Sequence, residues 1–176
     1  MNEPLIILDR RSIRRFTDQK IDHKTIKRIL TAAMYAPSAV NKQPWHFVVV
    51  DNPGLLKQMM EIHPHARMLS TASHGIVVCG DEKLQHGDGY WVVDCGAATQ
   101  NLLLAAHHYG LGGCWVGLHP REERKASFSE LLALPGHVRP FALVALGYPD
   151  EKKPRPQRFR ADRVRHNGWG KPYFTE

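Results

Sequence analysis

The segment 88–110, DGYWVVDCGAATQNLLLAAHHYG, constrains the fold of this chain more than any other. It predicts the longest helix, which should end at Gly110, where a glycine C-cap is expected. Apolar residues lie on all sides of this helix and not along a single stripe. Such a helix must be buried on several sides, either in a core or in a subunit interface.

Signals for strands and helices alternate before and after this segment. Residues rich in β-branched and aromatic side chains predict strands at 45–50, 75–80, 112–117 and 138–147. Further helices are expected at 3–9, from a cap at Asp22 to before Pro37, at 53–62 and at 122–132. The order predicts an α+β core over residues 1–150, with a mixed central sheet of four to five strands flanked by helices.

Residues 151–176 form a C-terminal extension without periodicity. Prolines at 154 and 156 and the scarcity of apolar residues prevent this extension from building a core of its own. Trp169, Tyr173 and Phe174 are nevertheless too apolar to stay in water. We therefore expect the extension to wrap over a second surface, that of a partner subunit.

The positive charge of the chain is concentrated in two places. The formal net charge is +7, from 24 Lys and Arg against 17 Asp and Glu. Residues 10–15 and 152–165 together contribute +10, so the remainder of the chain carries −3. Two separate clusters fit a local phosphate site, and they also fit a solvated turn with a basic tail. No nucleic-acid reader motif is present, so we expect no nucleic-acid partner.

The sequence gives little support for a membrane segment, a disulfide framework or a metal site. No apolar run approaches the ~20 residues that cross a bilayer, so no membrane association is expected. Cys79, Cys95 and Cys114 have no CxxC spacing, which predicts buried thiols in a cytoplasmic protein. The histidine pairs 63/65 and 107/108 lack the i, i+4 spacing and supporting carboxylate of a metal site, and we expect no metal.

Three segments could bind a ligand. Arg10, Arg11, Ser12 and Arg14 could present guanidinium forks and a hydroxyl to a phosphate. The proline-stiffened loop 37–45 offers amide and hydroxyl groups that suit the edge of a planar heterocycle. The glycines of 112–117 allow a flat ligand to approach the backbone closely.

Four motifs together resemble the flavin-dependent nitroreductase family. They are RRSIRRF, APSAVNKQPWHF, DCGAATQNLLLAAHHYGLGGCWVG and GYPDEKKP, in the order and spacing of that family. The resemblance covers nearly the whole chain, whose length is that of the small, minimal members. It implies the nitroreductase-like fold, FMN as cofactor and an intertwined homodimer with the flavin at the interface.

The resemblance also implies which residues hold FMN. One group would hold the phosphate and the ribityl chain: Arg10, Arg11, Ser12, Arg14 and, from the extension, Arg158 or the neighbouring Arg160. A second group would reach the flavin ring from the partner subunit: Pro37, Ser38, Ala39 and Asn41. A third group would run beside the ring near N5: Trp115, Val116, Gly117 and Leu118. Where relatives often carry a second serine, this chain has Ala39, so a hydroxyl contact is lost.

The implied activity is transfer of two electrons from NADH or NADPH to a nitroaromatic, quinone or similar small-molecule acceptor, in ping-pong fashion. The flavin supplies the hydride chemistry, so we expect no catalytic acid–base side chain. Two alternatives stay open: a specialised flavin reaction on the same fold, and a non-catalytic FMN-binding sensor or docking module.

Overall fold

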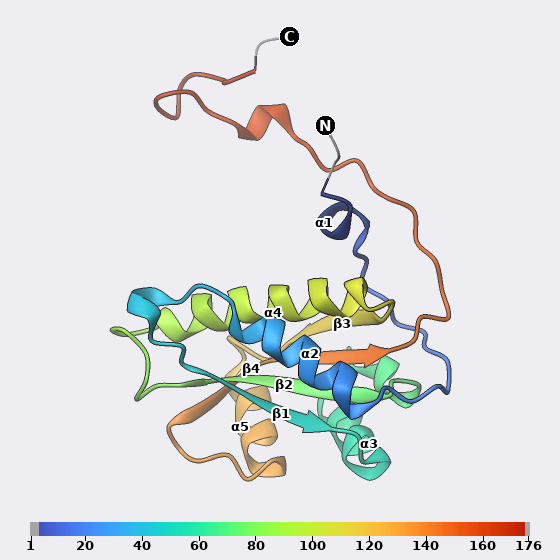
Figure 1. The fold of residues 1–176 in the computed structure, drawn as a ribbon. Coiled ribbons are helices and arrows are strands. Elements are labelled where there is room, and N and C mark those ends of the chain that lie inside the picture. Colours follow the sequence, from blue (N-terminus) through green and yellow to red (C-terminus); the bar gives the residue numbers. More distant parts are fainter. Residues whose placement is uncertain (1–3, 175–176) are drawn as a thin grey trace.

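A four-stranded antiparallel sheet runs through the centre of the computed structural model, which describes residues 4–174 (Figure 1). Its strands are β1 (Trp45–Val50), β2 (His74–Asp81), β3 (Gly112–Gly117) and β4 (Val138–Gly147). They lie in the order β1-β2-β4-β3, so β1 and β3 form the two edges. The predicted α+β class is confirmed, and so are the four strand positions to within a residue at each end.

The prediction of a mixed sheet is wrong, because every neighbouring pair of strands is antiparallel. Strands β2 and β3 do point the same way, since both pair antiparallel with β4. The chain crosses between them through a helix, as it does in parallel units. However, β4 lies between β2 and β3 and separates the two strands that run in the same direction.

Two helices cover each face of this sheet (Figure 1). The helices are α1 (Leu5–Asp9), α2 (His23–Met34), α3 (Pro53–Ile62), α4 (Tyr90–His108) and α5 (Glu122–Leu131). Helices α2 and α4 lie on one face, and α3 and α5 lie on the other. Asp22 caps α2 by accepting a hydrogen bond from the Thr25 N–H (2.9 Å), as the sequence predicts. Of the expected helix at 3–9, α1 is present, and residue 3 lies outside the described residues.

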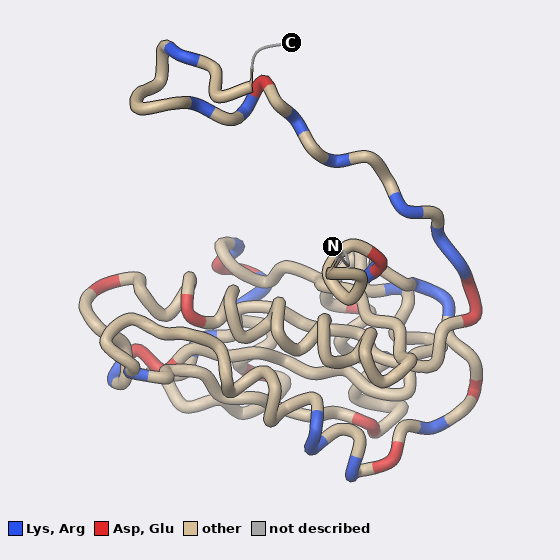
Figure 2. The backbone as a smooth tube through the Cα atoms, turned by 45° about the horizontal axis from the view of Figure 1, so that its top comes forward, with Lys and Arg blue, Asp and Glu red and all other residues tan. Residues whose placement is uncertain are grey.

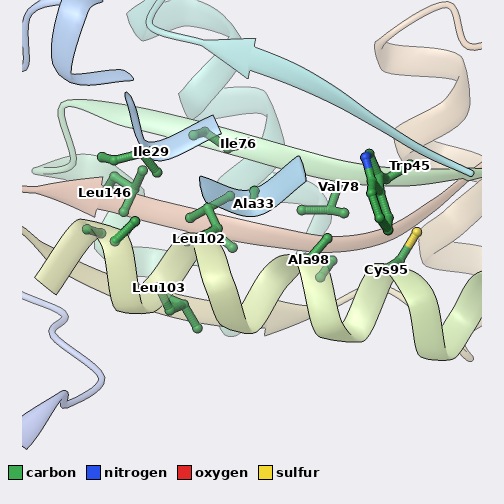
Figure 3. Packing of buried hydrophobic residues seen from close by; sticks show 14 of the residues in the cluster. Ile29, Ala33, Trp45, Ile76, Val78, Cys95, Ala98, Leu102, Leu103 and Leu146 are labelled. Carbon is green, nitrogen blue, oxygen red and sulfur yellow. The ribbon is translucent and has the colours of Figure 1, made fainter. Parts of the chain in front are cut away.

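The side chains of β2 alternate between two apolar cores. Ile76 and Val78 pack with α2 and α4 (Figure 3), whereas Val77 and Cys79 pack with α3 and α5. Successive side chains of a strand point to opposite faces, so a strand buried on both faces must be apolar throughout. All three thiols are buried as predicted, and burial raises the pKa of Cys79 to about 12.

Helix α4 is buried on two of its sides, against the sheet and against α2. Its third side is open in this chain, where Val93 is 64% exposed and Tyr90 is 49% exposed. Helix α1 lies over the C-terminal end of α4 and has no buried residue (Figure 1). The prediction of burial on several sides is therefore met only in part by a single chain. Among residues 4–174, no helix has the length and apolar character to span a membrane.

The chain after Glu151 leaves the body of the molecule and extends away from it (Figure 1). Lys and Arg recur along this segment (Figure 2), and Trp169 is 85% exposed. Phe159 and Phe174 contact each other edge to face, with ring centroids 5.3 Å apart. The later part of the extension thus has local contacts of its own.

We predict that Gly80→Ala destabilises the fold by about 1–3 kcal/mol, because the core beside β2 has no space for a methyl group. A Cβ at this position would lie 2.8 Å from Cδ2 of Trp91, whose ring is buried. The free energy of urea unfolding measures the effect. Gly136→Ala is the control, since a Cβ there meets nothing within 4 Å. Equal stability of the two variants would contradict this packing.

Candidate functional site

A cavity of about 1010 Å³ lies along the outer edge of β3. Residues from four parts of the chain line it: Arg14, Arg15, His63, Pro64, His65, Arg67, Met68, Ser70, Thr71, Cys114, Trp115, Val116, Gly117 and Arg124. This lining contains four arginines and no carboxylate. The cavity is therefore suited to a ligand that carries negative charge.

The backbone of β3 presents hydrogen-bonding groups to this cavity. The Gly113 carbonyl accepts a bond from the Ile13 N–H (3.1 Å), and the Gly117 carbonyl contacts Nε2 of His63 (3.0 Å). Both carbonyls point away from β4, and alternate residues of a strand share the same direction. The N–H and C=O of Trp115, midway between them, therefore point to the open edge, where a planar ligand can reach them.

His63 connects the loop after α3 to the end of β3. Its ring is 1% exposed, and its Nδ1 accepts a hydrogen bond from the His65 N–H (3.2 Å). Nε2 must then carry the proton that it donates to the Gly117 carbonyl, which fixes one neutral tautomer. Burial lowers the pKa of His63 below its ordinary value, and the charge of Arg124 lowers it further. His63 therefore holds the backbone of β3 in place beside the cavity as an uncharged group.

The two basic clusters lie side by side because the start of the extension pairs with residues 9–15. Glu151 Oε1 accepts bonds from the N–H groups of Arg14 (2.5 Å) and Arg15 (3.3 Å). Lys153 Nζ donates to the Ser12 carbonyl (2.6 Å). Arg155 Nη2 lies 2.7 Å from Asp9 Oδ1. Backbone and side-chain bonds of this kind hold the two segments in register against the repulsion between their charges.

Arg158 and Arg160 have different surroundings. Partial burial lowers the pKa of Arg10, and the nearby positive charge of Arg158 lowers it further. Arg160 instead forms a two-pronged ion pair with Asp162, with Nε–Oδ1 at 2.9 Å and Nη2–Oδ2 at 3.0 Å. Arg158 therefore acts electrostatically on Arg10, whereas Arg160 is paired with Asp162. An anion would relieve the repulsion between Arg10 and Arg158.

Two residues of the predicted phosphate and ring segments have structural roles in this chain. Arg11 donates to the carbonyls of Leu8 (2.8 Å), Arg10 (2.7 Å) and Pro154 (2.8 Å). Leu118 is fully buried, and its N–H donates to the Phe141 carbonyl (3.1 Å). Of the four residues predicted to lie beside the ring, Trp115, Val116 and Gly117 line the cavity.

The predicted loop with Pro37, Ser38, Ala39 and Asn41 lies outside this cavity. It is at the opposite end of α4 from residues 10–15 (Figure 1). Buried Asp94 of α4 holds the loop, since its Oδ1 accepts a bond from the Ala39 N–H (3.0 Å). A single chain therefore does not bring this loop to the other predicted site residues.

The cavity contains no thiolate nucleophile. Cys114 lines it, but burial raises the pKa of this thiol above its ordinary value. A thiol with a raised pKa is a poor nucleophile near neutral pH.

Several cavity residues were not identified from the sequence as ligand-binding: His63, His65, Arg67, Met68 and Arg124. The sequence analysis considers His63 and His65 only as metal ligands, and the pattern His63-Pro64-His65 gives no indication of a bond to Gly117. Arg67 begins a short 3-10 helix (Arg67–Ser70), and Arg124 lies in α5. Only the packing of α3 and α5 on the sheet brings them together.

The sequence profile of the nitroreductase family matches residues 7–85 and 65–148. The chain belongs to the nitroreductase family. A protein of Methanothermobacter thermautotrophicus, provisionally named NADH dehydrogenase/NAD(P)H nitroreductase, is 44% identical over 163 residues, covering 93% of this chain and 85% of the relative. A protein of Archaeoglobus fulgidus with the same provisional name is 46% identical over 168 residues, covering 93% and 97%.

Solved structures of this nitroreductase family have the same fold. A crystal structure from Parabacteroides distasonis, with the same provisional name, has a TM-score of 0.89 and 37% identity, covering 93% of this chain and 96% of the other. A provisionally assigned nitroreductase from Desulfovibrio desulfuricans, in complex with FMN, has a TM-score of 0.83 and 30% identity, covering 96% and 99%. The family resemblance of the sequence is confirmed, and a relative with the same fold binds FMN.

We predict that His63→Gln reduces the loss of stability at mildly acidic pH. Unfolded His63 takes up a proton near pH 6.5, whereas the folded residue, with its lowered pKa, stays neutral to a lower pH. The unfolded state then binds more protons, so the free energy of unfolding falls as the pH drops below about 6.5, by at most about 1.4 kcal/mol per pH unit for one group. The other titratable groups contribute equally to the pH dependence of stability in the unchanged protein and in His63→Gln.

The measurement is urea unfolding at pH 7.5 and pH 5.5. The control is His65→Gln. His65 is exposed, and it donates to His63 through its backbone N–H, which the substitution keeps. We expect the control to lose as much stability between the two pH values as the unchanged protein. An equally large loss in His63→Gln would show that His63 is not neutral in the folded state.

Proposed function

We propose that this nitroreductase-family protein binds FMN in the cavity along β3 and passes two electrons from NADH or NADPH to a small acceptor such as a nitroaromatic or a quinone. The observation that supports this most directly is the combination of an open strand edge with a cationic cavity of about 1010 Å³. A flat, anionic ligand suits both features. The names of the archaeal relatives agree with this activity.

The residues present fit the chemistry of FMN. The electrostatic effect of Arg158 on Arg10 supports a role of both in binding the phosphate, although of these three arginines only Arg14 lines the cavity itself. Arg forks bind phosphate through paired hydrogen bonds. Ser12 lies beside Gly113 at the start of β3, and Trp115, Val116 and Gly117 would run beside the ring. Arg11 and Leu118 would then act by holding the backbone in place.

When bound, FMN supplies the hydride chemistry of both half-reactions. The Trp115 N–H, on the open edge of β3, would donate a hydrogen bond to the ring. His63 keeps this edge rigid through its bond to the Gly117 carbonyl. The positive charge of the cavity favours the anionic reduced form of the flavin. In this proposal the chain binds and orients FMN and stabilises its reduced form by positive charge, and no side chain transfers protons.

We further propose that two chains share each site. The loop at 37–45 lies outside the cavity of its own chain and is available to a partner. Val93, Tyr90 and the aromatic residues of the extension are exposed in the single chain, which leaves a large apolar area for an interface. Interfaces of obligate dimers bury more than about 2,000 Å² and are mainly apolar.

The alternatives of a specialised flavin reaction and of a non-catalytic flavoprotein give different results in one experiment. The purified protein should be yellow, and NADH or NADPH should bleach its flavin absorption. A nitroaromatic or a quinone should then restore the colour and sustain turnover. A flavoprotein that is not bleached by either nucleotide would be a binding module, and one that is bleached but not reoxidised by these acceptors would favour a specialised reaction.

We predict that Arg158→Ala weakens FMN binding about tenfold or more, because a charge-assisted hydrogen bond contributes about 1.5–3 kcal/mol. Replacing Arg10 and Arg14 together should remove most of the flavin. The measurements are the flavin content of the purified protein and fluorescence titration of the apoprotein. Arg160→Ala is the matched control, since Arg160 pairs with Asp162 and should leave affinity unchanged. If Arg160→Ala lost flavin and Arg158→Ala did not, the phosphate assignment would be reversed.

We predict that truncation at Asp150 abolishes both the dimer and flavin binding. This change removes Arg158 together with the contacts between residues 9–15 and Glu151, Lys153 and Arg155. Light scattering reports the mass, and absorbance reports the flavin. A second truncation, after Arg165, keeps these contacts and removes only the last aromatic residues, and it should weaken the dimer first. A full-length monomer that holds FMN stoichiometrically would rule out the shared site.

A further inference from the structure

Among the described residues, one hydrogen bond joins the loop 37–43, between α2 and β1, to the rest of the molecule. The Ala39 N–H donates to Oδ1 of Asp94 in α4 (3.0 Å). The remaining bonds of the loop are internal, such as that from the Asn41 N–H to the Ser38 carbonyl (3.0 Å). The internal bonds fix the shape of the loop, whereas the bond to Asp94 fixes where the loop lies on α4.

Asp94 is a costly residue for its position. It is 4% exposed, and its second oxygen, Oδ2, has no hydrogen-bond partner among the described residues. A buried carboxylate oxygen without a donor lowers stability, and an apolar residue of similar size can replace such a group with little loss or with a gain. Stability therefore does not explain Asp94. What it supplies, and an apolar residue cannot, is an acceptor for the Ala39 N–H.

Helix α4 gives this bond a rigid base. The helix packs against the sheet and against α2, and Asp94 lies on its buried side, one turn from Trp91 and one turn from Ala98. A side chain locked by such packing holds its partner within narrow limits. The loop keeps a positive φ at Val40 (50°), a strained conformation, and it does not line the cavity of its own chain. A loop of fixed shape and fixed place suits contact with a ligand that a second chain holds.

We propose that Asp94 is a positioning residue of the site that two chains share. Through the Ala39 N–H it sets where the loop 37–43 meets the flavin ring in the cavity of the partner chain, and it does so at a cost to stability. This proposal rests on the proposed function and adds the residue on which the contribution of the loop depends. Asp94 does not line the cavity of its own chain, so its effect on the flavin passes through the loop.

Three variants separate the effect of this bond from the stability of the fold. Asp94→Leu removes the acceptor together with the unpaired buried oxygen. Ala39→Pro removes the donor and leaves Asp94 in place. Proline fits here, because Ala39 is the first residue of a helical turn and Ser38 before it is extended (φ −139°, ψ 156°). Asp94→Asn is the conservative variant, since its amide oxygen can still accept from the Ala39 N–H.

The control is Asn101→Leu, on the same helix. Asn101 Nδ2 donates to the Ala32 carbonyl of α2 (3.2 Å), so this change removes a bond of α4 that does not involve the loop. Hydrogen exchange with mass spectrometry reports the opening of residues 37–43 in the full-length, flavin-free protein. Fluorescence titration gives the affinity for FMN and for riboflavin, which has the same ring and no phosphate. Urea unfolding gives the stability.

We expect Asp94→Leu and Ala39→Pro to speed hydrogen exchange in the loop and to weaken the binding of FMN and of riboflavin by the same factor, about tenfold, because a contact with the ring is lost and the phosphate contact stays. Asp94→Leu should nevertheless keep the free energy of unfolding, since removal of the unpaired oxygen offsets the lost bond. Ala39→Pro should lower it, because both oxygens of the buried carboxylate are then unpaired. Asp94→Asn and Asn101→Leu should keep the exchange rate of the loop and both affinities.

Three outcomes would overturn the proposal. Full affinity for both flavins in Asp94→Leu and Ala39→Pro would show that the place of the loop does not matter to the cofactor. A loss for FMN but not for riboflavin would show that Asp94 acts on the phosphate end. A loss that follows the free energy of unfolding, and not the exchange of the loop, would show a purely structural role. The proposed function fails in a different way: if the unchanged protein binds neither flavin, the flavin site and this role of Asp94 are both excluded, whereas the exchange data still show whether Asp94 holds the loop.

Discussion

The position of β3 at the edge of the sheet determines where a ligand can bind. Strand β4 pairs with one side of β3, and the other side is held at its two ends by Ile13 and His63. Between these bonds the backbone of Trp115 faces the cavity. An exposed strand edge is normally a liability, because it can pair with other chains. Here arginine-rich segments and the His63 loop restrict it to a ligand-sized opening.

The arrangement of charge around this edge is maintained against repulsion. Segments 9–15 and 151–155 are both basic, and they lie together because Glu151, Lys153 and Arg155 bond to specific groups of residues 9–15. Partial burial lowers the pKa of Arg10, and the positive charges of Arg158 and Arg11 lower it further, so like charges repel each other here. Repulsion between these positive charges lowers the stability of the fold, and a bound anion would reduce this repulsion. Such an arrangement is typical of a binding site.

The local sequence pattern predicted the elements well, since the bounds of β1, α3, β3 and β4 follow directly from residue type, and the Asp22 cap forms as expected. The strand directions were not predictable in this way. They depend on β4 entering between β2 and β3, a long-range event that no window of sequence records. His63 and Arg124 were missed for the same reason, because each depends on long-range packing. His63 contacts Gly117, which lies 54 residues later in the chain. Arg124 reaches the cavity only because α5 packs on the sheet. The ion pair of Arg160 with Asp162 favours Arg158 for the proposed phosphate contact, and the sequence did not indicate this pair.

The loop after α2 gives a reason to place a partner subunit in the site. Val40, Asn41 and Gln43 all have positive φ, at 50°, 55° and 49°, which is unfavourable for side chains other than glycine and most of all for a β-branched one. Ser38, Asn41 and Asp94 hold this conformation through bonds to the Gln43 N–H, the Gln43 side chain and the Ala39 N–H. Strain that is held by several bonds is found at functional sites, where it fixes the geometry of ligand contacts. This loop does not line the cavity at β3 of its own chain, which supports the proposal that two chains share each site.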